Sequence, residues 1–235
     1  MKQSHYLCLD RTSTQSILNE ILTFFEKKSM IPYDDFILHE DITFFDSPNL
    51  RLYRSGGHCS ITESKNLSNP ENIRIPTLEY RRGKKTPTRR ILSENADFNM
   101  EEISKIMSFN NDLIQTLHMK SQTHRILLTH LGNKKTTPYF DFSIKEISVV
   151  SPKIQTPVDA VIVSLIDRTD LYYDRFTSSR LSFDIDHCLQ AFDDLLDSID
   201  LIKISSHNYG ELLDLTRTHS KTSMHLETNN ADEME

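Results

Sequence analysis

The feature that most constrains the fold is a mainly apolar run over residues 158–165, followed by an amphipathic pattern that ends at Ile199. The run is typical of a buried strand, and apolar residues at helical spacing after it indicate a helix that packs on the core. The apolar stripe of this helix comprises Leu181, Ile185, Cys188, Phe192, Leu195 and Ile199. Neither segment has the glycine turns or the nucleophile motif of an active site, which favours a packing and binding role.

Length and composition set the size of the core. The chain has 235 residues, of which 37% are hydrophobic and 26% charged, enough to bury one sizeable core. We expect a single domain over residues 1–216 and a disordered acidic tail over 217–235. There are only 5 Gly and no Trp, which disfavours glycine-rich phosphate loops. No stretch approaches the roughly 20 apolar residues of a membrane span, so we expect a soluble protein without a membrane partner.

The amino terminus and the cysteines indicate a reducing compartment. Residues 1–5 lack an apolar signal core, so we do not expect secretion. Cys8, Cys59 and Cys188 lie far apart, without partners at metal-ligand spacing. We therefore expect buried, apolar cysteines.

The formal net charge of -7 is unevenly distributed. A basic segment begins at Arg74 and ends at Arg90, whereas the last third of the chain is rich in acids. The basic segment is compatible either with a solvated hairpin turn, which we favour, or with a phosphate-binding patch. The overall balance does not indicate a sequence-specific nucleic-acid binder.

Periodicity and turn residues predict a chain of many short elements. Strands are expected over 6–9, 77–82, 88–92, 113–119, 125–131, 140–150 and 201–204, with two more meeting at a turn within 36–54, around residues 46–49. Helices are expected after the capping residues Thr12 and Asn99. So many strands remove exposed edges by curling. The predicted class is α+β: a curved, mostly antiparallel β-barrel with a few covering helices.

The search for chemistry finds no strong motif. The pairs His58-Cys59 and His187-Cys188 have no further metal ligands nearby, and no Gly-x-Ser-x-Gly occurs. Three histidines at a spacing of six would share one face of a continuous strand, but we expect breaks between them: His118, His124 and His130. We therefore predict no catalytic, cofactor-binding or metal-binding residues, and no cofactor.

The order of elements and several local runs resemble the family of Mediator complex subunit 18. The resemblance covers most of the chain and is carried by residues 5–10, 16–18, 36–40, 100–107, 160–166 and 201–204, together with the helix through Phe192 and Leu195. It implies a barrel in the head module of this transcription coactivator, paired with subunit 20 and receiving a helix from subunit 8. It further implies a nuclear, non-enzymatic scaffold that helps to couple regulators to RNA polymerase II.

An alternative follows from the same resemblance, because that barrel is related in shape to metal-dependent triphosphatases. Such tunnels need alternating glutamates for the metal and basic residues for the phosphates. Strands 5–9 and 160–165 contain no carboxylate, and Asp184 and Asp186 are expected in a helix, which leaves few oxygens for a metal. Candidate phosphate ligands are Arg81, Arg82, Lys84, Arg89, Arg90, Lys120 and Arg125. A nucleic-acid module built on the basic hairpin ranks third.

Overall fold

The structure is a computed structural model that describes part of the chain. The described residues are 3–9, 14–67, 77–81, 88–91, 113–131, 138–152, 154–168, 185–199, 201–204 and 210–218, with the backbone alone for 89–91 and 154–156. The strands are β1 (Gln3–Cys8), β2 (Met30–Asp46), β3 (His58–Asn66), β4 (Thr77–Arg81), β5 (Thr88–Ile91), β6 (Ile114–His130), β7 (Phe140–Ser151), β8 (Ile154–Asp167) and β9 (Ile202–Ile204). The helices are α1 (Thr14–Lys27), α2 (Arg51–Arg54), α5 (Ile185–Ser198) and a helix over 210–218.

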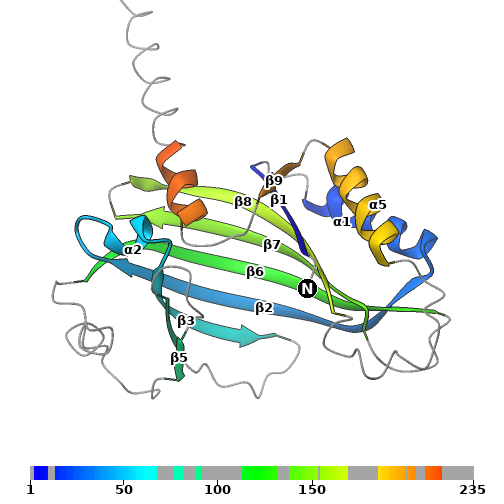
Figure 1. Ribbon diagram of the computed structural model, residues 1–235, viewed down its shortest axis with the longest axis horizontal. Helices are drawn as coiled ribbons and strands as arrows, with labels where there is room; N and C mark the ends of the chain where they lie inside the picture. The colour runs from blue at the N-terminus through cyan, green and yellow to red at the C-terminus, as the bar shows by residue number, and fades with distance from the viewer. Residues whose placement is uncertain are drawn as a thin grey trace, which may run out of the picture.

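The strands form one sheet of nine strands in the order β5-β4-β3-β2-β6-β7-β8-β1-β9. Every pairing in it is antiparallel. The long central strands curve together, and α1 and α5 lie near one end of the sheet while the 210–218 helix and α2 lie near the other (Figure 1). This architecture confirms the predicted fold class. The hairpin of β4 and β5 confirms the prediction that residues 77–82 and 88–92 pair.

Two local predictions in the middle of the chain are wrong. The first placed breaks between residues 113–119 and 125–131, but β6 is one strand of 17 residues. It pairs along its length with β2 on one side and with β7 on the other. Backbone hydrogen bonds from two neighbours therefore hold polar residues 120–125 in an extended conformation that their own sequence does not signal.

The second wrong prediction placed a strand after the turn at residues 46–49. The chain forms α2 there instead. The buried carboxylate of Asp46 accepts hydrogen bonds from the backbone N–H groups of Leu52 and Tyr53, each at 2.9 Å. A carboxylate beside the first turn of a helix satisfies donors that the helix cannot bond internally.

Side chains alternate between the two faces of the sheet, and each face is covered at a different end. On one face, here called the outer face, α1 and α5 pack on an apolar cluster that includes Phe25, Phe142 and Phe192. On the opposite, inner face, Leu212 and Leu213 of the 210–218 helix pack on β2, β6, β7 and β8. A third cluster lies at the β3–β4 end, around Cys59 and Leu78.

The remaining sequence predictions concern the cysteines, the segments outside the described residues and membrane-spanning helices. Cys59 and Cys188 are buried and Cys8 is half-buried, and none of the three forms a disulfide. The predicted helix after Asn99 lies outside the described residues, as do the segment 68–76 and residues 219–235 of the predicted tail. None of the helices in the described part of the chain is long and apolar enough to span a membrane.

Candidate functional site

A band of polar side chains crosses the centre of the inner face, beyond the end that the 210–218 helix covers. The register places its members on β2, β6, β7, β8 and β1, where alternation points them to the same side. We call it the inner polar band: Glu40, Ser121, Thr123, Arg125, Asp141, Ser143, Lys145, Ser164 and His5, with Arg168 just beyond the end of β8. Most of these side chains are buried or half-buried, which is unusual for polar residues at the middle of a sheet face.

Two arginines converge on one buried carboxylate in this band. Arg125 Nε donates to Asp141 Oδ1 at 2.7 Å, and Arg168 Nε donates to Asp141 Oδ2 at 3.0 Å; the Nη2 atoms of both arginines also bond to Oδ2. Asp141 is 3% exposed. Burial opposes its ionisation, but the hydrogen bonds from Arg125 and Arg168 outweigh burial and hold the pKa of the carboxyl below its ordinary value. The group is therefore an ionised cluster with one positive charge in excess.

A second ion pair bridges β2 and β7 over the inner face of β6. Lys145 Nζ on β7 reaches Glu40 Oε2 on β2 at 2.7 Å, across the intervening β6. Ser121 Oγ donates to the same Glu40 oxygen at 3.3 Å. Neighbouring strands are about 4.8 Å apart, so side chains that meet across a third strand must lean inward.

Across the sheet, the inner polar band ends at the buried His5 of β1. His5 Nδ1 lies 2.7 Å from Ser164 Oγ, and both side chains are almost fully buried. Burial lowers the pKa of His5, and the negative charge of Glu211 on the 210–218 helix partly opposes this. His5 is therefore a neutral hydrogen-bonding group at neutral pH.

The charge balance of the band favours an anion. Among its buried and half-buried side chains, Arg125, Lys145 and Arg168 supply three positive charges against the two negative charges of Glu40 and Asp141, a formal balance of +1; the exposed Asp34 lies on the same face at the edge of the band. The chain as a whole carries -7. Both arginine side chains are partly exposed, at 31% for Arg125 and 26% for Arg168. Such groups can hold phosphate or carboxylate oxygens by charge-assisted hydrogen bonds.

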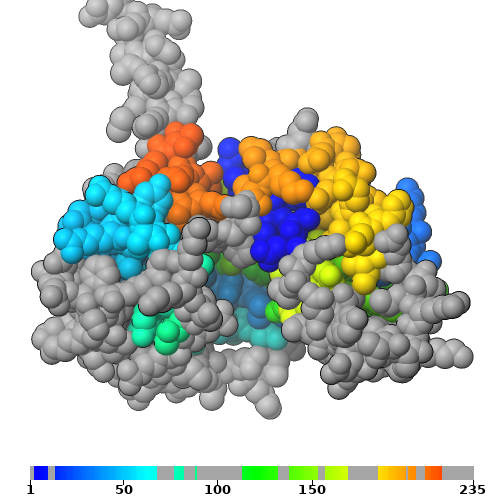
Figure 2. Space-filling model, in the orientation of Figure 1, coloured from blue at the N-terminus to red at the C-terminus, as the bar shows by residue number. Residues whose placement is uncertain are grey.

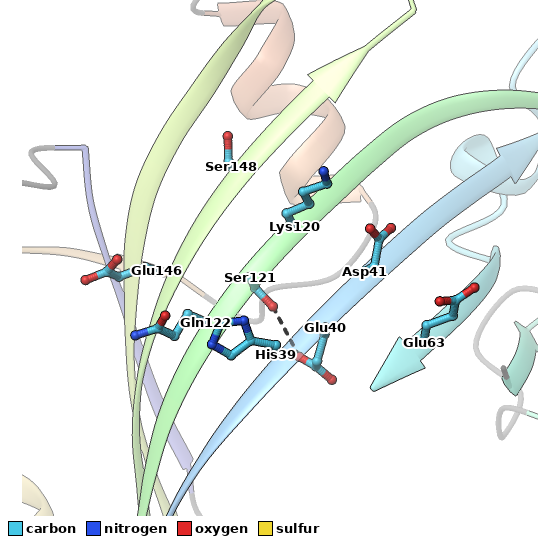
Figure 3. A pocket seen from close by; sticks show the side chains of 9 residues that line it. All are labelled: His39, Glu40, Asp41, Glu63, Lys120, Ser121, Gln122, Glu146 and Ser148. Carbon is cyan, nitrogen blue, oxygen red and sulfur yellow. Dashed lines mark hydrogen bonds between the residues drawn. The ribbon is translucent and has the colours of Figure 1, made fainter. Parts of the chain in front are cut away.

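A separate cavity of about 330 Å³ opens on the outer face at the same level of the sheet. Figure 3 shows its nine lining residues, from β2, β3, β6 and β7, with the bond from Ser121 to Glu40. Asp41, Glu63 and Glu146 give it an acidic character that Lys120 only partly offsets. Asp41 is already bonded to His118, with Oδ1 at 2.5 Å from Nε2. This cavity is therefore a poor place for an anion.

The structure does not bring together the phosphate ligands suggested by the sequence. Lys120 and Arg125 are five residues apart on one strand, so they lie on opposite faces: Lys120 lines the outer cavity and Arg125 belongs to the inner polar band. Arg81 lies on β4, separated from β6 by two strands, and its Nη2 donates to the carbonyl of Gly56 at 2.9 Å. Arg82, Lys84 and the side chains of Arg89 and Arg90 lie outside the described residues.

The three histidines share a face after all, because β6 is continuous. Six residues of strand span about 20 Å, so they cannot meet at one ion. His118 and His124 each pair with an aspartate of β2 instead, His118 with Asp41 and His124 Nε2 with Asp35 Oδ1 at 2.6 Å. His58, of the first His-Cys pair, bonds to Glu79 at 2.9 Å.

A divalent metal, which a triphosphatase tunnel requires, does not suit the residues that the structure describes. Among them no three His, Cys, Asp or Glu side chains are grouped so that they could hold an ion. The two carboxylates of the inner polar band already bond to cations. We therefore assign no metal to this site and derive no chemical step through one.

Most residues of the band carry no signal that sequence reasoning could use. Asp141, Lys145 and Arg168 are single charges within or next to strands, and each would be read as a solvated position. The one available clue was that each charge occupies a strand position whose side chain points toward the inner face. Recognising that position requires the register of the strands.

No protein-family model matches the chain, and no curated protein matches it. Solved structures do resemble it in fold. A protein of Pyrococcus horikoshii OT3 has a TM-score of 0.46 at 11% identity, covering 93% of this chain and 99% of that one. A Bacillus halodurans protein proposed to be an adenylate cyclase has a TM-score of 0.44 at 11% identity, covering 89% and 97%. A Hippeastrum protein proposed to be an adenylyl cyclase, and described as having a dominant triphosphatase activity, has a TM-score of 0.42 at 8% identity, covering 88% and 92%.

These comparisons correct one expectation and leave others without support. The prediction that the chain is not an enzyme is wrong in their light, because the similar structures include proposed cyclases and a protein with triphosphatase activity. They are proteins of the triphosphate tunnel fold, and none of them supports Mediator subunit 18, a role in transcription or a nuclear location. With TM-scores below 0.5 they do not assign an activity to this chain, so its activity has to be argued from its own residues.

Proposed function

We propose that the inner face of the sheet binds a triphosphate-bearing ligand, such as a nucleoside triphosphate. The observation that carries this proposal is that Arg125, Lys145 and Arg168 share the inner face, where they pair with only two carboxylates, those of Glu40 and Asp141. A chain of phosphates presents several oxyanions in a row, which matches cations contributed by two adjacent strands and the end of a third. The reaction proposed for the bound ligand is cleavage of its phosphate chain.

The preorganisation of the arginines supports the proposal. Asp141 fixes both guanidinium groups through four hydrogen bonds, so little side-chain freedom is lost when a ligand binds. Arg125 also lies 5.4 Å from the ring centre of Phe36, which limits its movement further. Fixed cations bind a phosphate chain more tightly than mobile surface lysines do.

The test compares two lysine variants of the full-length protein. Lys145→Met removes a cation of the inner polar band, and it is combined with Glu40→Gln so that no unpaired carboxylate remains. Lys120→Met is the matched control, because Lys120 is an exposed residue on the other face. Binding of ATP is measured by calorimetry with and without added magnesium, and phosphate release is measured in the same samples.

The expected result is a loss of affinity of roughly tenfold or more in the Glu40→Gln/Lys145→Met variant, because a hydrogen bond to a charged group contributes about 1.5–3 kcal/mol. Lys120→Met should bind as the wild type does. Equal affinities in the two variants, or a wild-type protein that does not bind ATP at millimolar concentration, would contradict the proposal.

A second candidate function is supported by an apolar groove beside the inner polar band, between the sheet and the 210–218 helix. Leu7, Ile162 and Ile204 of the sheet face Leu212 and Leu215 of the 210–218 helix around a cavity of about 250 Å³. The space-filling view shows this helix and α2 side by side (Figure 2), and Tyr53 Oη of α2 donates to Asp214 Oδ1 of the helix at 2.8 Å. We propose an amphipathic partner helix as the occupant, the mode of binding that the resemblance to Mediator subunit 18 implies for subunit 8.

Co-purification tests this second candidate. Leu215→Arg places a charge in the groove at a half-buried position, so the fold should tolerate it. The wild type should retain subunits 8 and 20 of the same organism in a pull-down, and the variant should lose subunit 8. Retention of neither subunit by the wild type would remove this candidate and would leave the triphosphate proposal untouched.

A further inference from the structure

One hydroxyl of the inner polar band has no partner, although it is buried. Thr123 is 7% exposed, and its Oγ1 makes no hydrogen bond within the part of the chain that the structure describes. Leaving a buried hydroxyl unbonded costs free energy, so buried hydroxyls are nearly always satisfied. An unsatisfied one at the centre of a candidate binding face indicates a missing acceptor.

The neighbours of Thr123 define what that acceptor meets. Thr123 pairs directly with Lys145 on β7, and Ser121 and Arg125 stand two residues away on the same strand and the same face. Directly paired side chains lie about 5 Å apart, and those two residues apart along a strand about 7 Å apart. The hydroxyl therefore lies between the Glu40–Lys145 pair and the Arg125–Asp141–Arg168 cluster.

Another buried threonine of β6, Thr116, shows the usual arrangement, in which the hydroxyl is hydrogen-bonded within the protein. Thr116 is 8% exposed, and its Oγ1 donates to the carbonyl oxygen of Phe44 at 3.2 Å. Its hydroxyl thus completes a bond to the backbone of the neighbouring strand, as buried threonines usually do. Thr123 has the same burial on the same strand but lacks such a bond, which makes Thr116 a matched control.

From this we infer that the Thr123 hydroxyl donates a hydrogen bond to a phosphoryl oxygen of the bound ligand, which Arg125 and Lys145 hold on either side. The inference rests on the proposed function and adds to it a residue that determines specificity. A neutral donor between two cations favours ligands that present an oxygen at this point. A ligand without an oxygen at this point gains no hydrogen bond from the Thr123 hydroxyl.

The test uses inorganic triphosphate and ATP as probes on the full-length protein, with three variants: Thr123→Val, Thr123→Ser and Thr116→Val. Thr123→Val keeps the shape of the side chain and removes the hydroxyl. We expect it to weaken binding of both probes about tenfold. Its midpoint of urea unfolding should equal or exceed that of the wild type, because the free protein loses no hydrogen bond. Thr123→Ser should restore affinity to within about threefold of the wild type.

Thr116→Val should show the opposite pattern, with lower stability and unchanged affinity. If Thr123→Val behaves in that way too, the hydroxyl serves the fold and the inference is overturned while the proposed function stands. If the wild type binds neither probe, both the inference and the proposed function fail. Loss of affinity in Thr123→Val without loss of stability supports the inference, since a merely structural role cannot produce it.

Discussion

Asp141 connects the two arginines of the inner polar band, and its charge holds them there. Its side chain is 3% exposed, and burial alone would raise the pKa of the carboxyl. Four hydrogen bonds from Arg125 and Arg168 reverse that preference and lower its pKa. The same bonds raise the pKa of Arg125, against the effect of its own partial burial. The three side chains therefore stay charged together.

Replacing Asp141 by Asn should be strongly destabilising, because it leaves two half-buried guanidinium groups without a counter-ion. We expect a loss of about 3 kcal/mol in the free energy of unfolding, measured by urea denaturation at pH 7. Asp35→Asn is the control, since Asp35 is 54% exposed and its pair with His124 should contribute about 1 kcal/mol or less. Similar losses in the two variants would show that Asp141 is not the organising charge.

The buried His5 predicts a dependence of stability on pH. Its pKa in the folded protein is below the ordinary 6.5, mainly because of burial. As the pH falls below 6.5, the unfolded chain takes up a proton that the folded protein still rejects, so the free energy of unfolding decreases. In His5→Gln the decrease between pH 7 and pH 5 should be shallower, as measured by urea denaturation at each pH.

Ser164→Ala is the control for that experiment. It removes the hydrogen bond to His5 but keeps the imidazole, so it should lower stability at every pH and preserve the slope. An identical slope in the wild type and in His5→Gln would assign the acid sensitivity to other groups.

At the scale of elements, α1 and α5 are joined to the sheet by a cluster of phenylalanines on the outer face. Phe192 of α5 lies 6.0 Å from Phe24 and 5.9 Å from Phe25 of α1, and 6.4 Å from Phe142 of β7, measured between ring centres. Its side chain is fully buried. Two helices far apart in sequence thus meet over one strand.

Phe192→Ala should therefore cost about 3–5 kcal/mol, the range for an aromatic side chain removed from a close-packed core. The measurement is urea unfolding followed by circular dichroism. Gln190→Ala, an exposed position on the same helix, should change stability by about 0.5 kcal/mol or less. A cost below about 1 kcal/mol for Phe192→Ala would mean that α5 is not docked as the structure shows.

At the scale of the whole molecule, an acidic protein carries a locally basic band on the inner face of its sheet. A net charge of -7 repels polyanions at long range, whereas the inner polar band attracts them at short range. Binding should therefore depend on contact with a few fixed cations and less on steering by the whole protein.

This predicts that ATP stabilises the folded protein by mass action. At a concentration of 100 times its dissociation constant, the gain should be about 2.7 kcal/mol, seen as a rise in the midpoint of thermal unfolding. Added salt up to about 1 M should reduce the rise, because it screens the partly exposed guanidinium groups. AMP, with one phosphate, should give a smaller rise than ATP. Equal rises for the two nucleotides would contradict recognition of the phosphate chain.

Sequence periodicity gave a correct account of elements whose apolar pattern is strong. The helices over 14–27 and 185–198, the β4–β5 hairpin and the final strand over 202–204 all follow from spacing and turn residues. The pattern did not predict a strand where polar residues occupy both faces, as in β6 from Lys120 to Arg125. It gave a wrong prediction after Asp46, where the turn residues precede a helix and the Asp46 carboxylate caps it.

By itself, the sequence determined the fold class, because alternation and helical spacing are local consequences of which side chains avoid water. Only the tertiary structure decided that Lys120 and Arg125 face opposite sides and that Arg125, Asp141, Lys145 and Arg168 share one. Register and curvature fix those positions, and both come from pairing between strands that are distant in the chain. A site built across several strands therefore exists only once the sheet has formed.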